Sequence, residues 1–574
     1  MPTKQALPSF SSKTLFFILS AFLLFLLPFL SRDYGITWDE WMDSNKGMLT
    51  LRNILSGGKD TAFMGFWHGY LYSELFYTVV GSLYGLFSGS IQTLAHDGLH
   101  DNARLISFYT FSHAMNSLFG FAALFFTGLL AKKAGTWRTA VLALLFIALS
   151  PRFLGNSMNN PKDIPFAATY VIALYALVRY LQGLPEINWK DGVFLALGIG
   201  ACIGMRIGGI LLIGYLFIFS FLILSQLLLA EKVDKKTAFK HAGITGGIAL
   251  LGLAAGYVFW PYGRMDPVRN TLSAIQKIST FDYWKGQVLF EGKIFKDAHL
   301  PWYYTLKWIA ISSPLFILAS PLPAVFAAKK SLKNFSMRIH LPILFAGIFP
   351  LVYMILRQTP VLDGWRHSLF IYPSLVVFAA LAWDSLPERA RSTKQKAGMG
   401  ALLIVLLLEP LSWMVRNHPN TYVYFNPLIG GVRGALGNYE TDYWGNCFRP
   451  AAEWLADYHK KNVSEKFPAA IVRADGQVMQ TYPFLKEKLG NQYTPLGYPP
   501  DFIHKDPYFF VDYGPLSRPL PWNYAIVFSR NFSPEVIRNG SWPPKGTLYE
   551  VKADGAALCA VVQNPGFKEF LKKR

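Results

Sequence analysis

The stretch Thr14-Leu-Phe-Phe-Ile-Leu-Ser-Ala-Phe-Leu-Leu-Phe-Leu-Leu-Pro-Phe-Leu-Ser31 runs directly into Arg32-Asp-Tyr-Gly-Ile-Thr-Trp-Asp-Glu-Trp-Met-Asp43. The first part holds 18 uncharged residues, enough for a helix that crosses the hydrocarbon core of a bilayer. The second part places two adjacent carboxylates, Asp39 and Glu40, eight residues beyond the apolar run and between two tryptophans. Because tryptophan favours the membrane surface, this junction predicts a spanning helix that ends in an acidic pair at the lipid–water boundary.

The composition of the whole chain agrees with a membrane location. The 574 residues are 52% hydrophobic and only 16% charged, and the mean hydropathy is +0.26. Soluble proteins carry about 25% charged residues, so the chain is predicted to be integral to a membrane. The net charge of +20 lies largely in short segments between apolar runs, where it sets topology, so no nucleic-acid partner is predicted.

Eleven apolar runs predict about eleven membrane-spanning helices and a mainly α, polytopic fold. The runs lie at 14–31, 105–131, 138–151, 164–184, 191–205, 207–229, 242–260, 305–328, 340–356, 368–384 and 397–415. The segment 66–90 is aromatic and contains Glu74, and it is interpreted as an interfacial helix. Counting this segment as a further span would invert the orientation of everything that follows it.

The positive charges orient these helices. With the N-terminus inside, the inner segments carry 18 Lys and Arg residues and the short outer segments carry five. Since positive charge is enriched on the inner side, this orientation is favoured. It places the loops 32–104 and 261–304 and the tail 416–574 outside, attached to a transmembrane domain at 1–415.

The tail differs in character from the rest of the chain. Short apolar runs alternate with amphipathic segments and predict a small extracytoplasmic α/β domain at 416–574. The predicted strands are 469–473, 524–528 and 557–562. The predicted helices are 450–460 and 477–489. A polar motif near its start, Tyr439-Glu-Thr-Asp-Tyr-Trp-Gly445, has carboxylates and rings that could bind sugar, but it is interpreted as an ordinary loop against the membrane domain.

Cysteine usage gives no disulfide framework. Cys202 lies in an apolar run, and Cys447 and Cys559 allow at most one pairing. The N-terminal apolar run is long for a signal peptide and lacks an obvious small-x-small cleavage site. We therefore interpret it as an uncleaved anchor.

The acidic pair is the first candidate for chemistry. A carboxylate such as Asp39 can align an acceptor hydroxyl and take its proton as a new bond forms, with Glu40 in support. The alternative is an acidic interfacial loop anchored by its tryptophans.

The outer-side cations are the second set of candidates. Lys162 lies between two spans, and Arg206, Arg366 and His367 lie at membrane depth or beside it. Arginine binds phosphate oxygens through paired N–H groups, so these cations could hold a lipid phosphate at the surface. The alternative is snorkelling of long side chains towards lipid headgroups. Asp163, next to Lys162, is either a site residue or the cap of the following helix.

The loop 261–304 supplies further candidate substrate-binding residues, namely Arg264, His299, Trp302 and Tyr303. Aromatic rings suit a sugar face or the entrance for a lipid chain, and they equally suit an interfacial belt. The sequence has no P-loop, G-x-S-x-G or H-E-x-x-H signature, and its histidine spacing predicts no metal site.

Taken together, these segments resemble the polyprenyl-phosphate-dependent GT-C glycosyltransferases, the group of protein O-mannosyltransferases and aminoarabinose transferases and their bacterial relatives. The resemblance rests on the order and common sidedness of five motifs and covers roughly residues 14–415. The motifs are Asp39-Glu40, Asn160-Pro-Lys-Asp-Ile-Pro-Phe166, Pro301-Trp-Tyr-Tyr304, Asp363-Gly-Trp-Arg-His367 and, in the tail, Tyr424-Phe-Asn-Pro427 through Asp442-Tyr-Trp-Gly445.

The resemblance implies a reaction and its participants. A sugar would move with inversion from a polyprenyl-phosphate donor to a lipid, glycan or protein acceptor outside a bacterial inner membrane. Asp39 would be the general base, and Lys162, Arg206, Arg366 and His367 would contact the donor phosphate. The scheme requires no metal or other cofactor, although some members of the group bind a divalent metal.

Two other functions fit an outer-side charge cluster. A transporter or flippase would move a lipid-linked sugar without chemistry, although the internal repeats common in transporters are not visible here. A glycan ligase would transfer a whole glycan rather than one sugar. The sequence alone does not separate these from a sugar transferase.

Overall fold

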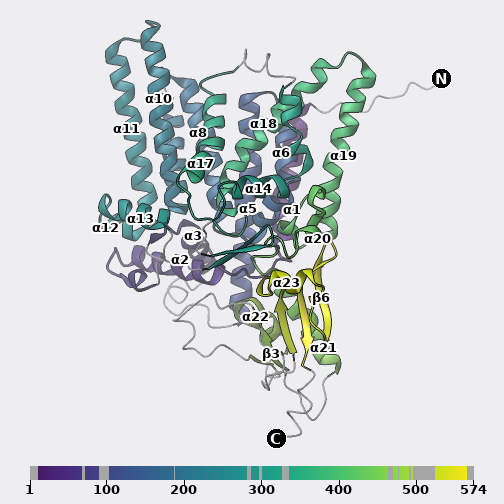
Figure 1. Ribbon diagram of the computed structural model, residues 1–574. Helices are drawn as coiled ribbons and strands as arrows, with labels where there is room; N and C mark the ends of the chain where they lie inside the picture. Colours follow the sequence, from purple (N-terminus) through teal and green to yellow (C-terminus); the bar gives the residue numbers. More distant parts are fainter. Residues whose placement is uncertain are drawn as a thin grey trace, which may run out of the picture.

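A computed structural model describes residues 11–66, 71–88, 102–186, 188–280, 286–296, 300–325, 335–462, 470–475, 478–489, 493–495 and 524–564. Most of the chain forms a bundle of long helices, and a small domain built on a sheet lies against one end of the bundle (Figure 1). This mainly helical architecture with a small C-terminal α/β part is the predicted fold class.

Within the described residues, seven helices are long and apolar enough to cross a membrane, or up to nine if each of two bent pairs is one span. The seven are α1 (Ser12–Ser31), α5 (Asn102–Ala134), α8 (Asp163–Gly183), α10 (Leu211–Leu229) with η3 (Ile207–Ile210), α11 (Lys235–Tyr257), α18 (Tyr372–Ser385) with η4 (Arg366–Ile371), and α19 (Thr393–Asn417). The chain is therefore a multi-pass membrane protein.

The predicted number of eleven exceeds this count for physical reasons. The run 138–151 forms α6 (Trp137–Ala148) and ends at a proline, where α7 (Pro151–Asn159) continues at 68° through a segment predicted as a loop. The run 305–328 breaks near a proline, where α14 (Tyr304–Ser312) meets the helix beginning with α15 (Leu315–Leu318) at 120°. Two more runs form α9 (Trp189–Met205) and α17 (His340–Leu356), each of only 17 residues.

The segment 66–90 contains α3 (Leu75–Phe87), which has 13 residues among those described. At 1.5 Å per residue it is about 20 Å long, less than the roughly 30 Å of a bilayer core. Figure 1 places α3 beside α2 (Glu40–Leu55), at the end of the bundle that also carries α12 (Pro261–Met265) and α13 (Arg269–Thr280). This position agrees with an interfacial helix rather than a span.

Short elements lie between the helices of the bundle and in the segment that leads to the C-terminal domain. They are η1 (Ala62–Gly65), the hairpin of β1 (Gln287–Phe290) and β2 (Lys293–Lys296), η5 (Leu386–Arg389), η6 (Thr421–Val423), η7 (Pro427–Ile429) and α20 (Gly431–Ala435). Asn426, which begins the turn into η7, donates to the carbonyls of Ala310 (2.7 Å) and Ser313 (3.0 Å) at the break after α14. This contact fixes the start of the tail to the membrane part.

The C-terminal domain is a five-stranded sheet in the order β4-β3-β5-β7-β6. Its elements are β3 (Ala470–Ala474), β4 (Tyr493–Pro495), β5 (Tyr524–Phe528), β6 (Thr547–Ala553), β7 (Ala556–Gln563), α21 (Phe448–Asn462), α22 (Val478–Leu489), η10 (Ser529–Asn531) and α23 (Pro534–Arg538). β3 pairs in parallel with β4 and β5, whereas β7 is antiparallel to β5 and β6. The three predicted strands and two predicted helices are confirmed.

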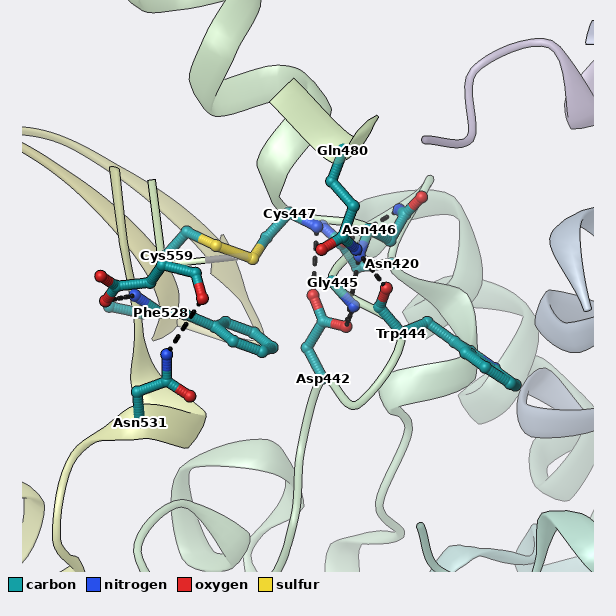
Figure 2. Close-up of a disulfide and its surroundings, with 12 residues drawn as sticks. Asn420, Asp442, Trp444, Gly445, Asn446, Cys447, Gln480, Phe528, Asn531 and Cys559 are labelled. Carbon is teal, nitrogen blue, oxygen red and sulfur yellow. Dashed lines mark hydrogen bonds between the residues drawn. A yellow bond between two sulfur atoms is a disulfide. The ribbon is translucent and has the colours of Figure 1, made fainter. Parts of the chain in front are cut away.

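A disulfide joins the domain internally. Cys447, just before α21, is bonded to Cys559 in β7, and the Cα atoms are 5.8 Å apart (Figure 2). This is the single pairing that the cysteine count permitted. Because disulfides persist in oxidising compartments, the bond is compatible with the predicted outer location of the tail.

Thiol labelling tests the pairing. We expect one of the three cysteines, the buried Cys202, to react with a maleimide when the purified protein is denatured without reductant, and all three to react after reduction. Mass spectrometry counts the labels. Three labels without reductant, in protein isolated under conditions that block thiol exchange, would show that the disulfide is absent.

Candidate functional site

A buried guanidinium lies at the centre of the candidate site. Arg366, the first residue of η4, is 7% exposed and faces three carboxylates. Its Nε donates to Asp363 Oδ2 (2.9 Å), Nη1 donates to Asp163 Oδ2 (3.3 Å), and Nη2 lies 3.6 Å from Asp39 Oδ2. Three segments far apart in the sequence therefore meet around one cation.

Asp163 joins a second predicted cation to this cluster. Its carboxylate accepts from Arg366 and from Arg206, which ends α9, and it also accepts from the side-chain amide of Asn160 (2.9 Å). The N–H of Asp163 at the start of α8 is bonded to Asn160 Oδ1 (3.0 Å). In the described residues, Asn160 thus satisfies this N–H, and the carboxylate of Asp163 faces the arginines instead of capping its helix.

The two neighbouring acids point to different partners. Asp39 is 19% exposed and faces Arg366, whereas Glu40 is fully buried. Glu40 accepts from the Thr37 N–H (2.6 Å) and from the Tyr77 hydroxyl (3.1 Å), and His113 Nε2 lies 3.0 Å from it. Glu40 therefore supports the turn that carries Asp39, and no sequence pattern indicated its partner His113 in α5.

Lys162 lies in a separate ion cluster close to Asp39. Its Nζ is 3.4 Å from Asp43 Oδ1, and Lys46 Nζ is 2.5 Å from the same oxygen. Burial alone raises the pKa of Asp43, but the ammonium groups of Lys162 and Lys46 outweigh it and lower the pKa to about 2. Asp43 follows Asp39 by one helical turn, so Lys162 is held beside the acidic end of α2.

The polar motif in the tail packs against the membrane part, as predicted, and one of its residues contacts Arg366. The ring of Trp444 lies under the Arg366 guanidinium, 4.8 Å from its carbon. The Trp444 carbonyl accepts from the Trp38 N–H (3.1 Å), directly before Asp39. Its indole N–H donates to Asn156 Oδ1 (3.0 Å). One residue of the tail thus contacts the cation, the acidic loop and α7.

This motif is itself rigidly held. The Asp442 carboxylate accepts from the N–H groups of Gly445 (2.7 Å) and Cys447 (3.1 Å), and Figure 2 shows this turn beside the disulfide. Asn446 Oδ1 accepts from the Gly35 N–H (2.7 Å), four residues before Asp39. The turn and the disulfide therefore position Trp444 and the acidic loop together.

Other predicted residues lie apart from the cluster. Arg264 in α12 donates to Asn53, Trp302 is 66% exposed, and Tyr303 donates to Glu291 (3.0 Å). His367, in contrast, belongs to the cluster, because it follows Arg366 and interacts electrostatically with Asp163, and its side chain is half-buried. The prediction for His299 lies outside the described residues.

Three residues that the predicted site did not include also belong to it. Asp363 pairs with Arg366, and Arg530 of the C-terminal domain pairs with both Asp363 (2.6 Å) and Glu440 (2.8 Å). Asp363 was visible in the motif with Arg366, but the Arg530 contacts join residues too distant in sequence for any spacing to indicate. In the part of the chain that the structure describes, no group of three or more His, Cys, Asp or Glu residues could hold a metal ion.

Comparisons with known proteins give weak similarities. No family model matches the chain. A Bacillus subtilis protein described as an uncharacterised transporter, YojE, is 29% identical over 102 residues, which is 16% of this chain and 34% of that protein. The chain thus spans about a third of this curated relative.

Three of the similar solved structures have low sequence identity to this chain. ArnT from Cupriavidus metallidurans in the apo state is 13% identical at a TM-score of 0.48, over 96% of this chain and 98% of that one. The complex of the same protein with undecaprenyl phosphate is 12% identical at a TM-score of 0.44, over 96% of this chain and 97% of that one. The apo form of the oligosaccharyltransferase of Archaeoglobus fulgidus is 15% identical at a TM-score of 0.47, over 90% of this chain and 69% of that one. At these scores the similarities alone establish neither family nor function.

The ion pairs of Asp43 predict a response to acid. Because its folded-state pKa lies near 2, below the usual 3.8, its stabilising contribution is present above about pH 4 and is lost as the pH falls through 2. We expect Asp43→Asn to cost on the order of 2 kcal/mol in the free energy of unfolding near pH 6 and little near pH 2.

Fluorescence-detected unfolding in detergent across this pH range measures the effect. Asp457→Asn is the matched control, since Asp457 is 55% exposed in its pair with Lys488 and should change little at either pH. An Asp43→Asn cost that is equal at pH 6 and pH 2 would contradict the assignment.

Proposed function

We propose that this protein is a GT-C glycosyltransferase that moves a hexose or pentose with inversion from a polyprenyl-phosphate donor to an extracytoplasmic acceptor. The observation that carries the proposal is the partly exposed Asp39 carboxylate, which faces the buried Arg366 at the membrane-surface end of α1. A base and an anion-binding cation in one site are what a displacement with a phosphate leaving group requires.

Asp39 acts as the general base in this proposal. It accepts the proton of the acceptor hydroxyl while that oxygen attacks the anomeric carbon and the bond to the lipid phosphate breaks. The 19% exposure of Asp39 supports this role, because an acceptor can reach it from outside the protein. Glu40 is a positioning residue, since its contacts with Thr37, Tyr77 and His113 leave it buried behind the turn.

Arg366 receives the negative charge that develops on the departing phosphate. Its guanidinium carries five N–H donors, and its three nitrogens face Asp363, Asp163 and Asp39, so N–H groups remain for phosphate oxygens. Arg206, Lys162 and His367 add positive or donor groups around it. Such cations take the place of a general acid, because the leaving phosphate is already a stable anion. The scheme uses no metal.

The location and domain roles complete the proposal. Residues 1–415 form the transferase part in a bacterial inner membrane, and 416–574 lie on the outer side. The contacts of Trp444 with Arg366 and Trp38 support a role of the tail in building the site. The acceptor class stays open among lipid, glycan and protein, and transfer of a whole glycan would use the same leaving group.

A transporter of lipid-linked sugars is the second candidate, favoured by the short match to YojE. It predicts movement of the intact donor across the bilayer. The transferase instead releases free polyprenyl phosphate and forms a new glycosidic bond. Proteoliposomes supplied with labelled undecaprenyl-phosphate sugars separate the two, because only the transferase changes the chemical form of the label.

Removing the proposed base tests the reaction. We expect Asp39→Asn to lower sugar transfer from undecaprenyl-phosphate donors at least ~100-fold, because the amide cannot accept the proton. Folding and membrane insertion should be kept. Asp33→Asn is the control, since Asp33 is 56% exposed and pairs with His418 outside the cluster. Transfer by Asp39→Asn at the rate of Asp33→Asn would remove Asp39 as the base.

Removing the central cation tests the phosphate site. We expect Arg366→Gln to weaken binding of undecaprenyl phosphate at least ~10-fold, because charged hydrogen bonds to phosphate are lost. Arg366→Lys keeps the charge and should be intermediate. The control is Arg357→Gln, an exposed arginine at the end of α17. Equal affinity of the Arg366→Gln and Arg357→Gln variants, measured by native mass spectrometry, would overturn the phosphate assignment.

A further inference from the structure

Arg530 reaches from the C-terminal domain into the ion cluster. It lies in η10, directly after β5, and its side chain is 28% exposed. Its Nη2 donates to Asp363 Oδ1 (2.6 Å) and to Glu440 Oε1 (2.8 Å), and its Nη1 donates to the Tyr443 carbonyl (3.2 Å). One guanidinium thus joins the sheet domain to two buried carboxylates.

Asp363 stands between two arginines. Oδ1 accepts from Arg530, and Oδ2 accepts from Arg366 Nε (2.9 Å). Its side chain is 8% exposed, and its backbone has φ +56°, a conformation in which a non-glycine residue needs support from its surroundings. The orientation of this carboxylate is therefore set by a cation on each side.

The hydrogen bonds of Asp363 determine the direction in which the Arg366 guanidinium points. A carboxylate with both oxygens free binds arginine through two parallel hydrogen bonds. With Oδ1 turned towards Arg530, Asp363 accepts from Arg366 through Oδ2 alone, and the two Nη groups of Arg366 are directed at Asp163 and Asp39. Without Arg530, Asp363 is free to take Nε and an Nη of Arg366 together and to draw the guanidinium away from the site.

We propose that Arg530 is a positioning residue by which the C-terminal domain aims Arg366 at the lipid phosphate. The inference rests on the proposed function, in which Arg366 binds that phosphate. It gives the sheet domain a definite task in the reaction: the membrane part supplies Arg366, and the tail supplies the cation that fixes its orientation through Asp363.

The chain offers a matched control in Arg538. This arginine lies in α23 of the same domain, and its Nη1 donates to the carbonyls of Gly292 (3.2 Å) and Gly437 (3.3 Å). It also ties the sheet domain to neighbouring segments, but its described contacts do not include Asp363. A loss of domain docking should affect both arginine variants, whereas a loss of Arg366 orientation should affect only one.

The experiment measures the affinity of the full-length protein for undecaprenyl phosphate by native mass spectrometry. We expect Arg530→Gln to bind at least ~10-fold more weakly than wild type, and Arg538→Gln to bind within about twofold. Arg530→Lys should be intermediate, because one ammonium replaces the fork. In an Asp363→Asn background, Arg530→Gln should add less than about a twofold loss, since its route to Arg366 is already removed.

The possible results separate the positioning role of Arg530 from the proposed function itself. Equal affinity of the Arg530→Gln and Arg538→Gln variants overturns the inference, and so does a full Arg530→Gln effect in the Asp363→Asn background. Failure of the wild-type protein to bind undecaprenyl phosphate instead overturns the proposed function. If Arg530→Gln does not fold, the same cycle with Arg530→Lys decides, because a loss that persists without Asp363 again contradicts the inference.

Discussion

The positive charge of the buried Arg366 guanidinium must be balanced, and the carboxylates around it provide the balancing charge. A buried charge that loses its partners costs several kcal/mol, so a cation that is 7% exposed must be surrounded by acceptors. Asp39, Asp163 and Asp363 come from the segment between α1 and α2, the start of α8 and the turn before η4. Neutralising one charge therefore fixes three segments, and these segments carry the residues from which we infer catalysis.

The same constraint extends into the C-terminal domain. Trp444 packs under Arg366 and holds the Trp38 N–H, while Arg530 holds Asp363 from the opposite side. The disulfide of Cys447 lies three residues beyond Trp444, so the sheet is covalently tied to the loop that touches the cation. The tail thus behaves as a structural part of the site, and its removal would leave Arg366 and the acidic loop without their second layer of contacts.

The sequence predicted the parts of this arrangement that depend on composition and local pattern. Long apolar runs predicted the membrane helices, and short apolar runs in the tail predicted β3, β5 and β7. The cost of an arginine at membrane depth indicated Arg206 and Arg366 as functional candidates. The sequence did not predict which side chains from distant segments pair with one another. His113 lies inside an apolar run, where a single histidine gives no periodic signal of its contact with Glu40. The bends after α6 and α14 depend on packing around a proline. The length of an apolar run does not predict such a bend.

A density map of the full-length protein in lipid nanodiscs with undecaprenyl phosphate would locate the phosphate without assuming a sugar or an acceptor. We expect a phosphate within hydrogen-bonding distance of Arg366, on the side that faces Asp39, with the lipid chain leaving towards the bilayer. A phosphate bound away from Arg366, or a lipid-free site at saturating undecaprenyl phosphate, would contradict this expectation.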